Sequence, residues 1–292
     1  MEQSAGRTRS RNISPTLRDF ARRAFEEDLG RGDVTSELTV EEDALALGRF
    51  VAREALVVSG LAAAQAVFAE ADPEVRFTAL TEEGDLTSEG AVIAEVEGSA
   101  RSVLAAERVS LNILMRLCGV ATMTKRYVEA VGGTGASITD TRKTTPGMRV
   151  LEKAAVLAGG GKNHRAGLDD GVLIKDNHLA LAGGVGEAVR RAKEGTPHLL
   201  KVQVEVEDMG MLRQALEAWA DAVLLDNMSP EEVAKAVGFT REAGHDLVIE
   251  VSGGVDLGSV RAYAEAGPDR ISSGALTHSA PAADISLDLE PC

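Results

Sequence analysis

The apolar and polar positions of the chain form two different patterns, which meet within a long helical segment over 103–131. Before this segment, a capped helix begins at Ser14-Pro15, and short stretches of alternating apolar and polar residues follow it. One helix over 61–70 separates two of these stretches. Short strands with an intervening helix predict a small α+β domain, which we place at residues 15–116. The predicted strands cover 44–52, 55–59, 75–80 and 91–97.

After Gly133 the pattern changes to nearly continuous apolar strands that alternate with amphipathic helices. This alternation is typical of parallel strands joined by right-handed helical crossovers. The predicted strands cover 136–140, 171–175, 200–206, 221–226, 246–251 and 269–273. The helices between them cover 186–193, 209–218, 230–242 and 257–266.

Polar residues stand at the end of nearly every predicted parallel strand: Asp140, Lys175, Glu205, Asp226, Ser252 and Ser273. An open sheet would spread these ends along an edge, whereas a barrel gathers them on one face around one centre. We therefore predict an α/β fold with a parallel, TIM-like α/β barrel at 117–280 behind the smaller N-terminal α+β domain. Residues 1–14 are predicted to be a disordered arm. Residues 281–292 are predicted to form a C-terminal tail that could return to the N-terminal domain.

The amino-acid composition narrows the classes of molecule that the protein could bind. With 46 acidic against 31 basic residues, the formal net charge of −15 argues against nucleic acid and anionic membranes as partners. No apolar run approaches the ~18 residues of a transmembrane helix, and the opening MEQSAGRTRSRN lacks the apolar core of a secretory signal. Only two cysteines occur, Cys118 and Cys292, which favours a reduced, cytoplasmic protein without structural disulfides.

Against this acidic background, cations gather between Thr139 and Leu179. The cluster predicts an anion pocket, because a planar guanidinium group can grip a carboxylate with two parallel hydrogen bonds. Thr145 is predicted to cap a helix with Pro146 at its first position. The three glycines of 159–161 are expected to end that helix and to let the backbone pass close to a ligand. The basic residues predicted to bind the anion are Arg142, Lys143, His164, Arg165 and Lys175.

Carboxylates stand at the ends of two neighbouring predicted strands. Glu205 and Asp226 supply hard oxygen ligands, which suit Mg²⁺ held jointly with substrate phosphates. Either residue could instead cap a helix or pair with Lys175 or Lys201. Glu207, which follows closely, is expected to be solvated.

Small residues follow the last two predicted strands. Serine and glycine there leave backbone N–H groups free to face a phosphate, as at the recurrent phosphate site of such barrels. The two turns are Ser252-Gly253-Gly254 and Ser273-Gly274-Ala275.

The chain also resembles one known family, the quinolinate phosphoribosyltransferases, also called nicotinate-nucleotide pyrophosphorylases. The resemblance is carried in order by DTRKTTPG, GGGKNHR, LIKDNH, EVSGG and SSGALTHSAPAADISLDL, and it runs from about Asp28 to the C-terminus. It implies an incomplete α/β barrel with a separate N-terminal domain. It also implies a homodimer with shared active sites, in which Arg108 of the neighbouring subunit joins the anion-binding residues. Lys143 would contact phosphoribosyl pyrophosphate.

The activity that the resemblance implies is transfer of phosphoribosyl from phosphoribosyl pyrophosphate to quinolinate. Decarboxylation would then give nicotinate mononucleotide, with CO₂ and pyrophosphate as the other products. The catalytic residues would be Lys143, Glu205 and Asp226, with Mg²⁺ as cofactor. The residues themselves leave other readings open: a Schiff-base lyase with Lys143 or Lys175 as nucleophile, a non-catalytic anion carrier, or a fold relative acting in molybdenum transport. The full TRKTTPG and NHR strings favour the quinolinate enzyme over the last of these.

Overall fold

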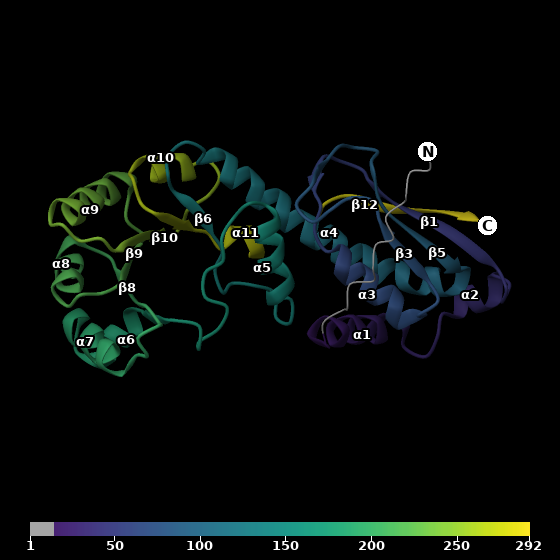
Figure 1. Cartoon of the computed structure of the whole chain (residues 1–292), viewed down its shortest axis with the longest axis horizontal. Helices are drawn as coiled ribbons and strands as arrows, with labels where there is room; N and C mark the ends of the chain where they lie inside the picture. The colour runs from purple at the N-terminus through teal and green to yellow at the C-terminus, as the bar shows by residue number, and fades with distance from the viewer. Residues whose placement is uncertain (1–14) are drawn as a thin grey trace, which may run out of the picture.

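The computed structural model describes residues 15–292, so the predicted arm 1–14 lies outside the described residues. Figure 1 shows two parts side by side, joined by the long helix α4 (Ala100–Ala130). One part contains an antiparallel sheet and the other a parallel sheet. The two patterns of the sequence therefore correspond to two kinds of strand pairing.

The N-terminal part is built on an antiparallel sheet in the order β12-β1-β5-β3. Its strands are β1 (Leu45–Ala52), β3 (Arg76–Ala79), β5 (Val92–Ser99) and β12 (Ile285–Pro291). The helices α1 (Pro15–Leu29) and α3 (Leu61–Ala71) lie in the same part. Phe50 of β1 contacts Phe68 of α3 and Phe77 of β3, with ring centroids 6.0 and 5.9 Å apart. This aromatic cluster joins the helix to the sheet, and the smaller α+β domain is confirmed.

Shorter elements complete this part. Helix α2 (Val34–Thr39) begins where the side chain of Asp33 accepts a hydrogen bond from the backbone N–H of Ser36 at 3.1 Å. Strand β2 (Leu56–Val57) is shorter than predicted, because it pairs only with β4 (Leu86–Thr87). The sequence pattern did not predict β4.

The C-terminal end of the chain belongs to the N-terminal sheet. After the parallel strands, β12 pairs antiparallel with β1, from Ile285 beside Ala52 to Pro291 beside Ala46. A side chain at Gly48 of β1 would meet Leu287 and Leu289 of β12 at 2.9 Å, so glycine permits this close pairing. The first and last strands of the described chain are thus neighbours in one sheet (Figure 1).

The second part is a six-stranded parallel sheet in the order β6-β11-β10-β9-β8-β7. Its strands are β6 (Ser137–Thr139), β7 (Val172–Ile174), β8 (Val202–Val206), β9 (Ala222–Asp226), β10 (Val248–Ser252) and β11 (Arg270–Ser272). The helices are α5 (Arg149–Ala158), α6 (Asp176–Ala182), α7 (Val185–Gly195), α8 (Met209–Glu217), α9 (Pro230–Glu242), α10 (Val260–Glu265) and α11 (Ala275–His278). Every predicted parallel strand is present, whereas α6 and α11 were not predicted.

The two edge strands of this sheet are β6 and β7. Successive strands from β7 to β11 are neighbours, and β6 closes the order beside β11. No ladder joins β6 to β7 within residues 15–292. The fold is therefore an incomplete parallel α/β barrel with a smaller N-terminal α+β domain, as the sequence analysis expected.

The three glycines of 159–161 pack against α4 rather than against a ligand. A side chain on Gly159 would lie 2.4 Å from the carbonyl oxygen of Ala121, and one on Gly161 would lie 2.8 Å from Cγ2 of Thr124. Both Ala121 and Thr124 are buried residues of α4. The expectation of a close ligand was wrong, because the closely approaching group is a helix of the protein itself.

Helix α5 begins at Arg149 and not at Pro146 as predicted. The Thr145 side chain does not cap it, because its hydroxyl donates to Glu152 Oε1 at 2.7 Å and its backbone N–H donates to Glu152 Oε2 at 3.0 Å. Residues 145–148 instead form a turn before the helix. None of the helices in the described part of the chain combines the length and apolar character that a membrane span needs.

Candidate active site

A cavity of about 710 Å³ lies at the carboxyl ends of the parallel strands. Because these ends converge in a barrel, residues far apart in the sequence share its wall. Most of the predicted site residues line it: Arg142, Lys143, His164, Arg165, Lys175, Asp226, Ser252, Gly253, Gly254, Ser273, Gly274 and Ala275. Glu205 and Arg108 are not part of this lining.

Asp140 organises the segment that follows β6. The residue is fully buried, and its carboxylate accepts hydrogen bonds from Nζ of Lys153 and, at 2.8 Å, from the backbone N–H of His164. Burial raises the pKa of Asp140, and these two hydrogen bonds oppose that rise. The carboxylate thereby ties the segment that carries Arg142 to the segment that carries His164.

Two guanidinium groups of the cavity wall have unused donors. The Nε atoms of Arg142 and Arg165 are buried, and neither has a hydrogen-bond partner among residues 15–292. Burial lowers the pKa of Arg165, and the charge of Arg142 lowers it further. Two like charges held close together with free donors are unfavourable unless an anion binds between them. This part of the wall is therefore suited to a carboxylate or a phosphate.

His164 faces the cavity, and the protein engages both of its ring nitrogens. Its Nδ1 accepts a hydrogen bond from the backbone N–H of Arg165 at 2.7 Å. Its Nε2 then carries the hydrogen and lies 3.2 Å from Oε1 of Gln203 and 3.5 Å from Oε2 of Glu250. Gln203 also donates to Glu250 at 3.0 Å. A buried polar network thus fixes the orientation of the ring.

Carboxylates gather at the ends of β8 and β9. Ligand oxygens of Glu205, Glu207 and Asp226 lie within 4.8 Å of one another. Glu205 is buried, and its Oε2 lies 2.5 Å from Nζ of Lys175, so the alternative reading of Glu205 as a lysine partner is realised here. Burial raises the pKa of Asp226, Lys175 lowers it, and Glu207 raises it again. Three hard oxygen donors would suit a Mg²⁺ ion. Glu207 is exposed, as expected from the sequence, although its carboxylate lies within this group.

The two glycine turns leave little room for side chains. Gly253 has a φ of +93°, and a side chain there would lie 2.3 Å from Oδ1 of Asn227. A side chain on Gly274 would lie 2.9 Å from Cδ of Lys143 and 2.8 Å from Nε2 of His278. Glycine therefore keeps backbone N–H groups at the cavity wall beside a lysine. This arrangement suits a phosphate group.

Arg108 lies outside the cavity of its own chain. It is an exposed residue of α4, on the helix that joins the two parts of the molecule. Its assignment to the site of a neighbouring subunit stays a prediction.

Several polar residues at or around the cavity were missed by sequence reasoning. Gln203 and Glu250 sit inside apolar strands, and Lys153 sits inside an amphipathic helix. Asn227 carries a signal that only the structure reveals, a φ of 55° that is uncommon outside glycine. Glu250 lines the cavity, and its Oε1 atom has no partner among the described residues.

The fold and the site together describe an α/β-barrel protein with a cationic cavity suited to a ligand with several negative charges. Sequence profiles of the N-terminal and C-terminal domains of quinolinate phosphoribosyl transferase match residues 33–118 and 120–288. The chain belongs to this family, and the resemblance noted in its sequence is confirmed.

Individual relatives cover nearly the whole chain. A probable nicotinate-nucleotide pyrophosphorylase [carboxylating] of Bacillus subtilis is 40% identical over 273 residues, which cover 94% of this chain and 93% of the relative. The nicotinate-nucleotide pyrophosphorylase [carboxylating] of Mycobacterium leprae is 40% identical over 275 residues, covering 93% of this chain and 96% of the relative. The solved structure of the nicotinate-nucleotide pyrophosphorylase from Francisella tularensis has a TM-score of 0.89 and 38% identity, covering 94% of this chain and 96% of that one.

Proposed function

We propose that this protein transfers the phosphoribosyl group of phosphoribosyl pyrophosphate to quinolinate, with decarboxylation to nicotinate mononucleotide. The observation that carries the proposal is the pair of guanidinium groups, Arg142 and Arg165, whose buried Nε donors are unused. Both stand in one cavity with Lys143 and Lys175. The names of the relatives, nicotinate-nucleotide pyrophosphorylase and quinolinate phosphoribosyltransferase, point to the same activity.

The cationic wall is where quinolinate would bind. Its two adjacent carboxylates would be gripped by Arg142 and Arg165, and Lys175 would reach them after leaving Glu205. Such binding places the ring nitrogen in a fixed direction inside the barrel. Positioning of this kind supplies much of the rate enhancement when two substrates must meet.

Phosphoribosyl pyrophosphate would bind in the same cavity, at the carboxyl ends of β8 to β11. In the turns 252–254 and 273–275, the backbone N–H groups of Gly253, Gly254 and Gly274 would donate to a phosphate, with Lys143 beside Gly274. The N–H groups of Ser273 and Ala275 already donate to Thr139 O and to Ser273 Oγ. Glu205, Glu207 and Asp226 would hold Mg²⁺, which supplies stabilisation of the departing pyrophosphate when it is bound. The residues of the chain would align the ring nitrogen of quinolinate with the ribose carbon that loses pyrophosphate. The cationic wall then stabilises the negative charge that the remaining carboxylate retains.

A Schiff-base mechanism does not suit the lysines of this site. Lys175 is paired with Glu205 and is half exposed, whereas a nucleophilic lysine needs surroundings that favour its neutral form. Lys143 stands close to Gly274 in a wall rich in other cations. We further propose that the protein is a homodimer in which Arg108 completes the site of the neighbouring subunit.

The experiment that tests the function is a product assay with the purified full chain. Quinolinate and phosphoribosyl pyrophosphate are supplied with Mg²⁺, and nicotinate mononucleotide is measured by chromatography. Nicotinate serves as the control substrate, because it lacks the second carboxylate and should leave part of the cationic wall unbalanced. Comparable rates with the two acids, or no product from quinolinate, would contradict the proposal.

A further inference from the structure

The predicted anion ligands on the β6–β7 side of the cavity stand largely on two loops. The first cation loop (140–148) follows β6 and carries Arg142 and Lys143, and the second cation loop (162–170) carries His164 and Arg165. The main-chain link between the loops is short. It consists of an isolated parallel bridge between Thr139 and Lys162, formed by hydrogen bonds from Lys162 N to Ile138 O at 2.8 Å and from Asp140 N to Lys162 O at 3.1 Å. Beyond that point, side chains must fix one loop relative to the other.

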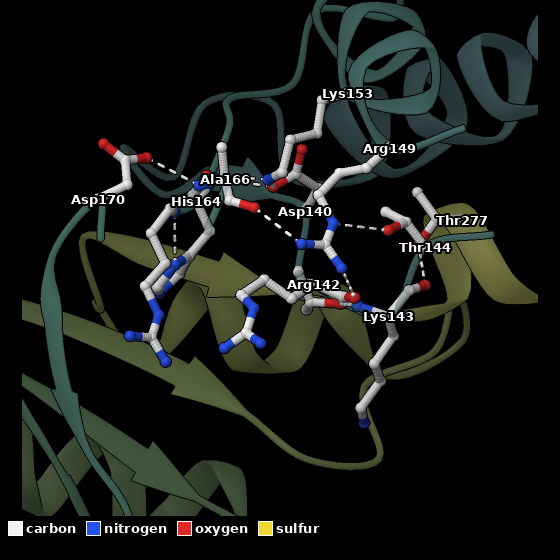
Figure 2. A network of polar contacts seen from close by, with 12 residues as sticks. Asp140, Arg142, Lys143, Thr144, Arg149, Lys153, His164, Ala166, Asp170 and Thr277 are labelled. Atoms are coloured by element: carbon white, nitrogen blue, oxygen red, sulfur yellow. Dashed lines mark hydrogen bonds and ion pairs between the residues drawn. The ribbon is translucent and has the colours of Figure 1, made fainter. Parts of the chain in front are cut away.

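Arg149, the first residue of α5, reaches both loops at once (Figure 2). Its Nε donates to the hydroxyl of Thr144 at 2.9 Å, and its Nη2 donates to the carbonyl of Arg142 at 3.3 Å. Its Nη1 donates to the carbonyl of Ala166 in the second cation loop at 3.0 Å. The planar fork of one guanidinium group thus spans the two loops, which a flexible ammonium group cannot do with the same geometry.

Lys153 makes a second bridge one helical turn further along α5. Its Nζ donates to the carboxylate of Asp140 and, at 2.9 Å, to the carbonyl of His164. Lys153 is buried, so removing it would leave the buried Asp140 without its cation. Arg149 is only partly buried, which makes it the residue that can be changed without such damage.

We infer that Arg149 is a positioning residue that clamps the two cation loops at the spacing quinolinate requires. It does not itself line the cavity, and it contacts no predicted ligand side chain, since its acceptors are two backbone carbonyls and a threonine hydroxyl. All three acceptors are uncharged, so the role can be separated from charge by a lysine substitution. The link to quinolinate rests on the proposed function, whereas the clamp itself does not.

The test compares three variants of the full chain: Arg149→Ala, Arg149→Lys and Arg241→Ala. Arg241 is the matched control, because it also makes three side-chain hydrogen bonds, to Leu247 O and to both carboxylate oxygens of Asp269. These partners precede β10 and β11, at the opposite end of the sheet from the cavity. Two quantities are measured for each variant: backbone hydrogen exchange in peptides covering the two loops, and the Kd of quinolinate by calorimetry.

Arg149→Ala should speed exchange in both loops and weaken quinolinate binding ~10- to 100-fold, because the displaced guanidinium groups would lose part of their charged contacts with the two carboxylates. Arg149→Lys keeps the positive charge and loses the fork, so it should stay close to Arg149→Ala in both measurements. Arg241→Ala should leave loop exchange and quinolinate binding unchanged. If Arg149→Lys restores binding in full, or if exchange in both loops is unaffected by Arg149→Ala, the clamp is wrong. If the unmodified protein fails to bind quinolinate, the proposed function fails, and the exchange data alone decide on the clamp.

Discussion

The two ends of the parallel sheet differ in whether their charged groups have hydrogen-bond partners. At the amino ends of the strands, Asp221 accepts hydrogen bonds from Val202 N at 2.8 Å and from Lys193 Nζ at 2.7 Å. Asp269 likewise accepts from Ile249 N at 2.7 Å and from Arg241. Each aspartate stands just before one strand and accepts from the backbone of the neighbouring strand that precedes it in the chain, so these charges hold neighbouring strands in register.

At the carboxyl ends, comparable groups are left incomplete. The Nε atoms of Arg142 and Arg165 and the Oε1 atom of Glu250 are buried without partners among the described residues. A buried polar group without a partner destabilises the fold, and it persists where a ligand can satisfy it. Charge alone therefore does not mark the functional end of a barrel. Buried charged groups without hydrogen-bond partners do.

The largest effect that this contrast predicts is the loss of activity in Arg165→Ala. Removing one buried contact to a substrate carboxylate should lower kcat/KM for quinolinate by ~30-fold to several thousand-fold, since an uncompensated charge contact costs about 2–5 kcal/mol. The melting temperature should fall only by what one hydrogen bond contributes, from Arg165 Nη1 to Gly171 O at 3.0 Å, because the Nε donor has no protein partner to lose. Arg241→Ala, at the other end, should do the reverse: it should lower the melting temperature and keep the activity. A large stability loss in Arg165→Ala with unchanged kinetics would overturn the contrast.

The acidic group at the carboxyl end leads to the second prediction. Glu205→Gln combined with Asp226→Asn should lower turnover ~10- to 100-fold at a Mg²⁺ concentration that saturates the wild type, because two of the three oxygen ligands lose their charge. The measurement is the initial rate as a function of Mg²⁺ after treatment with EDTA. The control is Asp246→Asn, which changes an exposed aspartate before β10. If the turnover of the EDTA-treated double variant is unaffected, the assignment of Mg²⁺ to these carboxylates is wrong.

The proposed sharing of active sites between two subunits leads to a third prediction, whose expected effect is of intermediate size. Arg108→Ala and Lys143→Ala should each be nearly inactive, because each site would combine Lys143 of one subunit with Arg108 of the other. When equal amounts are dissociated and reassociated at random, half of the dimers are mixed and each mixed dimer has one intact site. About a quarter of wild-type activity should then return, as two-fold symmetry requires. Each variant treated alone is the control. No recovery despite verified mixing would place Arg108 outside the partner's site.

Much of this contrast could be predicted from sequence because strand ends are local features. A run of apolar residues followed by Lys175 or Asp226 identifies both the strand and the polar group at its end, and the fold then brings such ends together. Gln203 and Glu250 gave no such signal. They lie inside apolar strands, and only the curvature of the parallel sheet decides which face of a strand points into the incomplete barrel.

The start of α5 was misjudged for a different physical reason. Thr145 followed by Pro146 is a good local helix start, but Glu152 takes both the hydroxyl and the backbone N–H of Thr145. Glu152 is in turn fixed by Arg116 of α4, whose Nη2 lies 2.7 Å from its Oε1. A contact with a distant helix therefore overrides the local preference for a helix start at Thr145. The packing of Gly159 against α4 is a second contact between segments that lie apart in the sequence. Neither contact can be read from the pattern of one segment.

The smallest expected effect concerns stability at the amino end. Burial alone would raise the pKa of Asp221, but hydrogen bonds from Lys193 and from Val202 N–H outweigh it and hold the pKa below its ordinary value. A carboxyl group whose pKa is lowered by folding stabilises the native state above its unfolded pKa of ~3.9, and this stabilisation is lost as the pH falls through the folded value.

Asp221→Asn should therefore melt a few degrees below the wild type at pH ~7, since ~1 kcal/mol moves Tm by about 2–4 °C in a chain of 150–250 residues. The gap should narrow as the pH is lowered through the acid range, with kcat/KM unchanged at neutral pH. Asp246→Asn, measured in parallel, should show no such pH-dependent gap. A gap that stays constant down to the acid limit would mean that the charge of Asp221 does not stabilise the strand ends, and that the two ends of the sheet differ less than their hydrogen bonds indicate.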